Sequence, residues 1–234
     1  MITISQLQKD FGPKRAVDIA DCHIGRGEML GLVGNNGAGK TTLFRLILDL
    51  LEPSRGTVCI DGIDVGRSEV WKTHTGAYLD GSFLIDYLTP EEYLTFVGRT
   101  GGLRSEEVQE RLAPFERFFG GEVLGQGKYI RHLSAGNKQK IGIAAAMLLQ
   151  PDLLILDEPF NFLDPSSQAT IRHILTQYNR EHGATILISS HNLQHTVDIC
   201  SRIVLLEGGL ILRDLPNADR SAERELEEYF FERV

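Results

Sequence analysis

The feature that most constrains the fold of this chain is a glycine-rich stretch at residues 34–42, which reads Gly-Asn-Asn-Gly-Ala-Gly-Lys-Thr-Thr. An apolar run at residues 29–33 precedes it and is typical of a buried strand. Leucine and isoleucine residues after it recur at helical spacing, at positions 43, 46, 47 and 50. A turn that merely joined the strand to the helix would not need Lys40 and Thr41 at the helix start. The stretch therefore predicts a phosphate-binding loop in an α/β fold.

The chemistry of this loop follows from its residue types. Glycines let main-chain N–H groups turn inward around phosphates, and the start of the helix adds a partial positive charge. Lys40 is expected to reach the β- and γ-phosphates of a nucleotide, and the Thr41 hydroxyl is expected to ligate Mg²⁺. The predicted nucleotide-binding residues of the loop are Gly34, Asn35, Asn36, Gly37, Ala38, Gly39, Lys40, Thr41 and Thr42.

Two adjacent carboxylates follow a second apolar run. Residues 153–156 are too few for a helix, so they predict a buried parallel strand that ends at Asp157 and Glu158. Asp157 is expected to hold the metal ion, and Glu158 is expected to act as general base toward the attacking water. The same pair could form an ordinary turn, but the phosphate-binding loop favours the catalytic interpretation.

The stretch at residues 134–137, Ser-Ala-Gly-Asn, predicts the start of another helix. The Ser134 hydroxyl is a candidate N-cap, and a helix start is also the simplest interpretation of the stretch. The small pair Ala135 and Gly136 would nevertheless leave a phosphate-sized nest at that start. Because the chain has one nucleotide loop and two anion sites, the second site is expected to serve the nucleotide of another subunit.

Composition limits the possible functions. With 234 residues, 42% of them hydrophobic, the chain is long enough for one sizeable core. The net charge of −8, from 24 basic and 32 acidic residues, argues against a protein that neutralises many phosphates of a nucleic acid duplex. Three widely spaced cysteines, Cys22, Cys59 and Cys200, favour a reducing compartment over a disulfide framework. No signal peptide or membrane span is predicted, so any membrane role would depend on a partner chain.

The predicted secondary structure changes twice along the chain, from mixed α/β to helical and back to mixed α/β. Residues 1–81 and 132–234 predict a nucleotide-binding α/β core with an antiparallel β-layer, in which Gly12 marks a turn between two strands. Residues 53–56 are expected to form a further turn, followed by a strand at residues 57–60. The whole is predicted to be a single domain.

An inserted helical subdomain is predicted between these parts, at residues 82–131. Pro90 marks a helix start, Ser105 is a candidate N-cap of a second helix, and Pro114 is expected to kink or break that helix. After the subdomain, Asp164 followed by proline is the predicted N-cap of a further helix of the core.

These motifs, in this order, make the chain resemble the nucleotide-binding subunits of ABC transporters, most closely the single-domain type that pairs with a separate permease. The resemblance implies a P-loop NTPase fold with a RecA-like core, an antiparallel β-layer and a helical subdomain that contacts the permease. By this likeness residues 34–42 are the Walker A motif, 133–137 the signature, 153–158 the Walker B motif and 161–164 the D-loop. His191 is the switch histidine, which would contact the γ-phosphate of ATP.

The resemblance adds residues to the expected ATP site. Phe11 falls where the family places an aromatic residue that stacks on adenine, whereas the sequence alone leaves an ordinary core aromatic as the alternative. From the signature and the D-loop, the expected ATP-binding residues are Ser134, Ala135, Gly136, Asn137 and Asp164.

The chain departs from the family pattern in three places. The signature has Ala135 and Asn137 where Gly and Gln are usual, and the D-loop has the bulky Phe162 where a small residue is common. Asp80 stands where the Q-loop glutamine is expected, and it is shorter and negatively charged. It is expected either to act at the Mg²⁺ site, through a water, or to face solvent. None of these changes removes a predicted catalytic residue.

The function implied by the resemblance is ATP hydrolysis by a head-to-tail dimer that powers a membrane permease from the cytoplasmic face, with no direct contact to nucleic acid. The expected catalytic residues are Lys40, Glu158 and His191, and the expected Mg²⁺ ligands are Thr41, Asp157 and Asp80. Two alternatives stay open: a soluble ABC protein that acts on nucleic acid or ribosomes, and a nucleotide-gated binding module with little turnover. The acidic composition counts against the first, and Asp80 and Phe162 are the only hints of the second.

Overall fold

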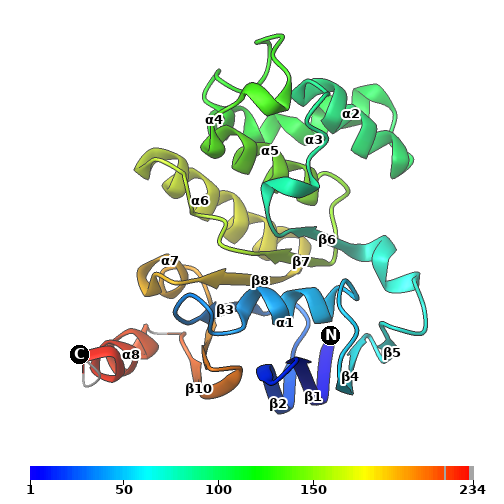
Figure 1. Cartoon of the computed structure of the whole chain (residues 1–234). Coiled ribbons are helices and arrows are strands. Elements are labelled where there is room, and N and C mark those ends of the chain that lie inside the picture. Colours follow the sequence, from blue (N-terminus) through cyan, green and yellow to red (C-terminus); the bar gives the residue numbers. More distant parts are fainter. Residues whose placement is uncertain (219, 232–234) are drawn as a thin grey trace.

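The computed structural model describes residues 1–218 and 220–231, and a six-stranded sheet lies at its centre (Figure 1). The strand order is β10-β9-β3-β8-β7-β6, with all neighbours parallel except β10, which is antiparallel to β9. The strands are β3 (Met29–Val33), β6 (Thr75–Tyr78), β7 (Leu153–Leu156), β8 (Thr185–Ser190), β9 (Arg202–Glu207) and β10 (Leu210–Pro216). Because the carboxyl ends of the parallel strands share one edge, the glycine-rich loop, Asp157 and His191 emerge close together.

A second sheet is antiparallel, with the strand order β2-β1-β4-β5. Its strands are β1 (Ile2–Phe11), β2 (Lys14–Ile24), β4 (Arg55–Ile60) and β5 (Ile63–Asp64). The predicted turn at Gly12 is confirmed, but the turn expected at residues 53–56 is shorter. Arg55 already pairs with Gln8 of β1. Gly56, at φ +83°, lies at the irregularity between this pair and the pair of Ser5 with Thr57, where a Cβ would be 2.2 Å from the carbonyl oxygen of Gln6.

Helix α1 (Lys40–Ile47) fills the space between the two sheets. One face of the central sheet and the inner face of the antiparallel sheet bury their side chains against it. The buried apolar residues of α1 are Leu43, Phe44, Leu46 and Ile47. Leu50 was expected to continue this pattern, but the helix ends before it and its side chain is exposed.

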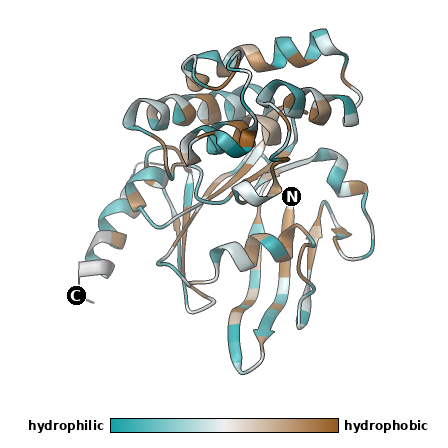
Figure 2. Cartoon of the chain, turned by 45° about the horizontal axis from the view of Figure 1, so that its top comes forward, coloured by the Kyte–Doolittle hydropathy of each residue, from teal (hydrophilic) through white to brown (hydrophobic). Residues whose placement is uncertain are grey.

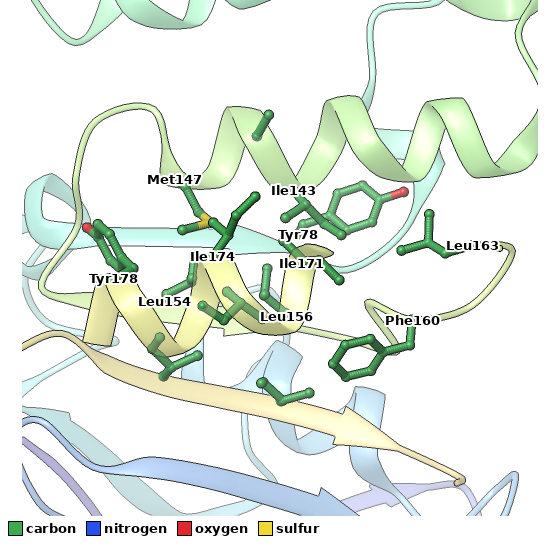
Figure 3. Packing of buried hydrophobic residues seen from close by; sticks show 14 of the residues in the cluster. Tyr78, Ile143, Met147, Leu154, Leu156, Phe160, Leu163, Ile171, Ile174 and Tyr178 are labelled. Carbon is green, nitrogen blue, oxygen red and sulfur yellow. The ribbon is translucent and has the colours of Figure 1, made fainter. Parts of the chain in front are cut away.

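The opposite face of the central sheet packs against α5 (Ala135–Met147) and α6 (Pro165–His182). Figure 3 shows Met147 of α5 and Ile174 of α6 meeting above Leu154 of β7. Asp164 caps α6 by accepting hydrogen bonds from two main-chain N–H groups, as the sequence predicts. Strands β3, β7 and β8 are buried along their whole length, and the strands in the middle of the molecule are largely hydrophobic in Figure 2, which is typical of strands covered on both faces.

The segment between β6 and α5 is helical, as expected, and lies beyond α5 in Figure 1. Its helices are α2 (Pro90–Thr100), α3 (Ser105–Leu112) and α4 (Glu116–Phe119). Short 3₁₀ turns occur here and before β6, at η1 (Val70–His74), η2 (Gly81–Phe83), η3 (Ala113–Phe115) and η4 (Ile130–His132). Pro114 lies in the break between α3 and α4, but Ser105 is not the N-cap of α3. Arg104 occupies that position, and its main-chain N–H donates to Glu107 instead.

The C-terminal part adds α7 (Leu193–Val197), which packs on β3 and β8, and α8 (Ser221–Phe231), which packs on α7 and β10 (Figure 1). Ala222 and Leu226 of α8 are buried in the same apolar cluster as α5 and α6. The three cysteines are free thiols. Within residues 1–218 and 220–231, no helix combines the length and the hydropathy needed to cross a bilayer.

Candidate functional site

The glycine-rich loop is held tightly between neighbouring strands. A Cβ at Gly34 would lie 2.2 Å from the carbonyl oxygen of Leu206 on β9, and one at Gly39 would lie 2.5 Å from that of Ala16 on β2. Gly39 also has φ +110°, which side chains rarely permit. The loop can follow this path only with glycine at these two positions, and main-chain N–H groups are then free to face a ligand.

Lys40 begins α1 and turns back along the loop. Its ammonium group donates to the carbonyl oxygen of Gly34 at 2.6 Å and lies 3.3 Å from the Glu158 carboxylate, although the side chain is only 6% exposed. A buried ammonium is stable only with partners of this kind. The structure therefore brings the predicted phosphate-binding lysine and the predicted base into direct contact.

Asp157 directly follows β7 and is buried beside the start of α1. Thr41 Oγ1 donates to one carboxylate oxygen at 2.5 Å, and the Ser189 hydroxyl donates to the other. Burial raises the pKa of Asp157, while the hydrogen bonds from Ser189 and Thr41 act in the opposite direction. Two of the three predicted Mg²⁺ ligands, Thr41 and Asp157, thus adjoin each other.

Glu158 has an unusual backbone and well-defined partners. Its φ of +50° lies in the left-handed region, which is uncommon for a residue with a side chain. Its main-chain N–H donates to Ser189 Oγ at 2.8 Å. His191 Nδ1 lies 2.8 Å from Glu158 Oε2, so the carboxylate stands between Lys40 and His191. All three predicted catalytic residues form one contiguous group.

A hollow of about 330 Å³ opens beside this group. Its lining combines the loop from Asn36 to Thr42 with Phe11, Lys14, Ala16 and Glu158. The Phe11 ring is 49% exposed, so the core-aromatic alternative is wrong, and its position at the hollow agrees with a stacking role. Asn35 does not line the hollow; its carbonyl oxygen accepts from Ala38 N at 3.1 Å and shapes the loop from behind.

The signature and D-loop residues lie outside this hollow. Ser134 caps α5 by accepting from Asn137 N at 3.2 Å, and Ser134 and Ala135 are exposed. Gly136 packs on the D-loop: a Cβ there would lie 2.6 Å from the carbonyl oxygen of Phe162. The Asp164 carboxylate caps α6, and the hydrogen bond from the Ser167 hydroxyl lowers its pKa. One chain therefore does not bring these residues to its own loop.

Asp80 is engaged by two neighbours. Its Oδ1 accepts from Ser82 N at 2.7 Å, and its Oδ2 lies 3.7 Å from the guanidinium of Arg45. Arg45 is four residues after Thr41 on α1, so it lies on the same helix face as that predicted Mg²⁺ ligand. The role of Asp80 at the metal stays a prediction.

Sequence reasoning missed two residues of this region. Ser189 bonds both Asp157 and the main chain of Glu158, and Gln139 donates to the Glu158 carbonyl oxygen at 3.0 Å. The signal for Ser189 was its place at the end of an apolar strand, next to the carboxylate-bearing strand. Gln139 gave no signal, because it stands in the polar run at residues 137–140 near the start of a helix, and such residues usually face solvent.

The residues present fit a Mg²⁺ ion that is shared with nucleotide phosphates. No cluster of three or more His, Cys, Asp or Glu side chains suited to a metal occurs among the described residues. Mg²⁺ bound with phosphates commonly takes only one or two carboxylates from the protein. The buried Asp157 carboxylate and the Thr41 hydroxyl supply such a minimal set of oxygen donors.

Comparison with known proteins agrees with this geometry. A family model described as ABC transporter matches residues 17–161. The ABC transporter ATP-binding protein NatA of Bacillus subtilis is 34% identical over 219 residues, which cover 91% of this chain and 88% of NatA. The tungstate uptake system ATP-binding protein TupC of Peptoclostridium acidaminophilum is 33% identical over 210 residues, which cover 90% of this chain and 96% of TupC.

Solved structures give the same result. The structure of an ATP-binding subunit of an ABC transporter superposes with a TM-score of 0.86 at 30% identity, covering 99% of this chain and 98% of the other. A bacterial ABC transporter cassette solved as a dimer has a TM-score of 0.81 at 24% identity, covering 92% and 98%, and shows that the fold is shared. This chain belongs to the ABC transporter family, as one of its ATP-binding and ATP-hydrolysing subunits.

Proposed function

We propose that this chain hydrolyses ATP with Glu158 as general base, as one half of a head-to-tail dimer that drives a separate membrane permease. The observation that carries the proposal is the row of Lys40, Glu158 and His191 beside the loop, with contacts of 3.3 and 2.8 Å. Next to a phosphate-binding loop, a cation can stabilise the charge of the transferring phosphoryl group and a carboxylate can orient and deprotonate the attacking water.

The contact between Lys40 and Glu158 suggests how ATP prepares the base. A γ-phosphate would compete with the Glu158 carboxylate for the Lys40 ammonium, because both anions are attracted to the same cation. Once displaced, the carboxylate is free to accept a proton from the attacking water. His191, which contacts the other carboxylate oxygen, would keep Glu158 oriented during this exchange.

Thr41 and Asp157 are the proposed holders of Mg²⁺, with Asp80 acting at most through a water. When bound, the ion neutralises negative charge on the β- and γ-phosphates. Burial penalises the ionised form of Asp157, and a nearby cation favours that form. Thr41 already points its hydroxyl at Asp157, so the two oxygens would meet the ion from adjacent positions.

The dimer is proposed because the signature faces solvent, away from the hollow. The N-terminus of the 13-residue α5 offers N–H groups and a partial positive charge, and Ser134 and Ala135 leave it accessible. In a head-to-tail pair each ATP would lie between Lys40 of one subunit and Ser134 of the other. Phe162, 73% exposed in the adjacent D-loop, would be covered by the same contact.

The proposed partner is a permease on a separate chain, at the cytoplasmic face of the membrane. The names of the relatives support a transport role but differ in cargo: TupC belongs to a tungstate uptake system and BcrA of Enterococcus faecalis to bacitracin transport. We therefore assign no cargo. The net charge of −8 counts against the alternative of a nucleic acid partner.

Replacing Glu158 by Gln tests the catalytic proposal. The amide keeps the shape but loses the basicity, so turnover should fall by about 100-fold or more while the affinity for ATP stays within about threefold. Glu28→Gln is the matched control, because Glu28 is also partly buried and paired, with Arg202 at 3.1 Å, but lies outside the hollow. It should keep parental turnover. Glu158→Gln turnover within a few-fold of the parent would show that Glu158 is not the base.

Isolation of the chain with its native partner tests the transport proposal. A tagged chain, purified from a detergent extract of its own cells, should retain a polytopic membrane protein. Ribosomes or DNA in its place would instead support the alternative function.

A further inference from the structure

Two hydrogen bonds in series, made by the buried side chains of Tyr78 and Gln139, link β6 and α5 to the main chain of Glu158. Tyr78 Oη donates to Gln139 Oε1 at 3.2 Å, and Gln139 Nε2 donates to the carbonyl oxygen of Glu158 at 3.0 Å. Tyr78 and Gln139 are each 5% exposed. Because solvent does not reach them, the loss of either bond would leave a polar group without an equivalent partner.

Tyr78 is fitted closely to α5. It is the last residue of β6, and its carbonyl oxygen accepts from Asp157 N at 2.9 Å. Its ring lies against Gly142, where a Cβ would be 2.0 Å from a ring carbon. Figure 3 shows the ring directly beneath the helix. Glycine weakens a helix interior, so its presence at position 142 is explained by the room that the Tyr78 ring needs.

The tyrosine hydroxyl fixes the orientation of the Gln139 amide. A carbonyl oxygen only accepts hydrogen bonds, so the amide nitrogen must face Glu158 and the amide oxygen must face away from it. The Tyr78 hydroxyl donates to that oxygen. Without this donor, the amide would lose the contact that holds its nitrogen toward Glu158.

The main chain of Glu158 is held on both sides of its Cα. Ser189 Oγ accepts from the N–H at 2.8 Å, and Gln139 donates to the carbonyl oxygen. The residue between them has φ +50°, a conformation that persists only when its surroundings enforce it. Gln139 is also five residues after Ser134 on the helix that begins at the signature, so one rigid element reaches both.

We propose that Gln139, held by the Tyr78 hydroxyl, is a positioning residue that sets the backbone of Glu158 and thereby the direction of its carboxylate. The proposal rests on the proposed role of Glu158 as base. It assigns Tyr78 and Gln139 an effect on the rate of hydrolysis that is separate from ATP binding, because neither residue lines the hollow.

Tyr78→Phe is the sharpest test, because it removes one oxygen and leaves the ring on Gly142. We expect kcat to fall about tenfold and KM for ATP to stay within about twofold, since misplaced catalytic groups affect the chemical step. Tyr178→Phe is the matched control, because Tyr178 belongs to the same apolar cluster as Tyr78 (Figure 3). Its buried hydroxyl donates to the Pro151 carbonyl oxygen at 2.9 Å. This control variant should keep parental kcat.

Gln139→Met provides an independent variant of similar size. It should lower kcat at least as much as Tyr78→Phe, and the double variant should be no slower than Gln139→Met alone, because the two residues act through one contact. Equal kcat for Tyr78→Phe and Tyr178→Phe, or losses that multiply in the double variant, would overturn the proposal.

One comparison of these variants and one further measurement separate the positioning role from the proposed base and the proposed dimer. If Glu158→Gln abolishes turnover while Tyr78→Phe leaves it unchanged, only the positioning role fails; if Glu158→Gln stays active, the role of the base itself fails. Tyr78→Phe in a Glu158→Gln background should dimerise with ATP as well as Glu158→Gln alone. If the double variant failed to dimerise, the lower kcat of Tyr78→Phe would come from a disturbed signature, and the positioning role would be contradicted.

Discussion

The glycine-rich loop and the signature both lie at the start of a helix, but the rest of the chain surrounds them to very different degrees. The loop is pinned between β2 and β9, and Lys40 at its end is buried. The signature caps α5 at the surface, where Ser134 and Ala135 are exposed. We call the loop and the signature the two half-sites of the proposed ATP site. Core packing sets the geometry of the loop half-site, whereas the signature half-site would meet a nucleotide only when, in our proposal, it is held on another subunit.

The glycines of the loop and of the signature, unlike their surroundings, have the same cause: a main-chain carbonyl oxygen approaches each of them closely. Gly34 and Gly39 are required because strands of the core approach the loop closely. Gly136 is required because the carbonyl oxygen of Phe162 approaches α5, so the signature and the D-loop form one packed unit. A glycine in the signature thus has an intramolecular packing reason, whether or not it also contacts a phosphate.

The largest expected difference between the loop and the signature is in their effect on ATP binding by the single chain. Lys40→Ala removes the buried cation at the end of the loop, so ATP affinity should fall about 100-fold, or roughly 2.7 kcal/mol. Ser134→Arg is the comparison variant, and at concentrations where the chain is monomeric its ATP affinity should match the parent. Calorimetric titration measures both. Equal losses in the two variants would mean that the halves act on one ATP within one chain.

Phe11, at the edge of the hollow, should contribute less to ATP affinity than Lys40. Phe11→Ala removes the exposed ring, so ATP affinity should fall about tenfold, as expected for the loss of one aromatic stacking contact. Its affinity for inorganic triphosphate should not change, because that ligand has no base to stack. Phe83→Ala, which removes an equally exposed ring outside the hollow, serves as control in the same titrations. An equal loss for ATP and triphosphate would contradict stacking.

The smallest effect is expected at Asp80. Its charge would repel metal-free ATP, so Asp80→Asn and Asp80→Gln should bind ATP about two- to fivefold better without Mg²⁺ and gain less on its addition. The matched control is Asp86→Asn, because Asp86 is also exposed and lies 3.6 Å from a lysine, Lys138. Titrations of ATP across a Mg²⁺ series provide the readout. Superimposable curves for all variants would leave Asp80 without a role at the metal.

Much of the fold was predictable because local patterns and global packing agree. The apolar runs at β3, β7 and β8 are buried on both faces, and the caps at Ser134 and Asp164 are observed. The errors lie at the ends of helices, where Asp49 turns to φ +53° after α1 and where Glu107 accepts from the main-chain N–H of Arg104. Leu50 continues a helical pattern beyond the end of α1, and Arg104, not Ser105, occupies the N-cap position of α3.

The candidate site was predictable as a set of motifs but not as a network. Motif spacing identified Lys40, Asp157 and Glu158, since each follows a short, recognisable strand. The support around them comes from Ser189 and Gln139, which are far away in sequence and belong to elements that read as ordinary core. Their roles depend on strand order and helix docking, which no local pattern specifies.

Light scattering of the Glu158→Gln chain tests the central claim most directly, because this variant should bind ATP without consuming it. The chain has a mass of 26.1 kDa, and we predict that mass without nucleotide and twice that mass with ATP and Mg²⁺. Adding Ser134→Arg should abolish the increase, whereas Ser105→Arg, at the exposed start of α3, should not. An unchanged mass with ATP, or a dimer that forms without nucleotide and tolerates Ser134→Arg, would contradict a site shared between two subunits.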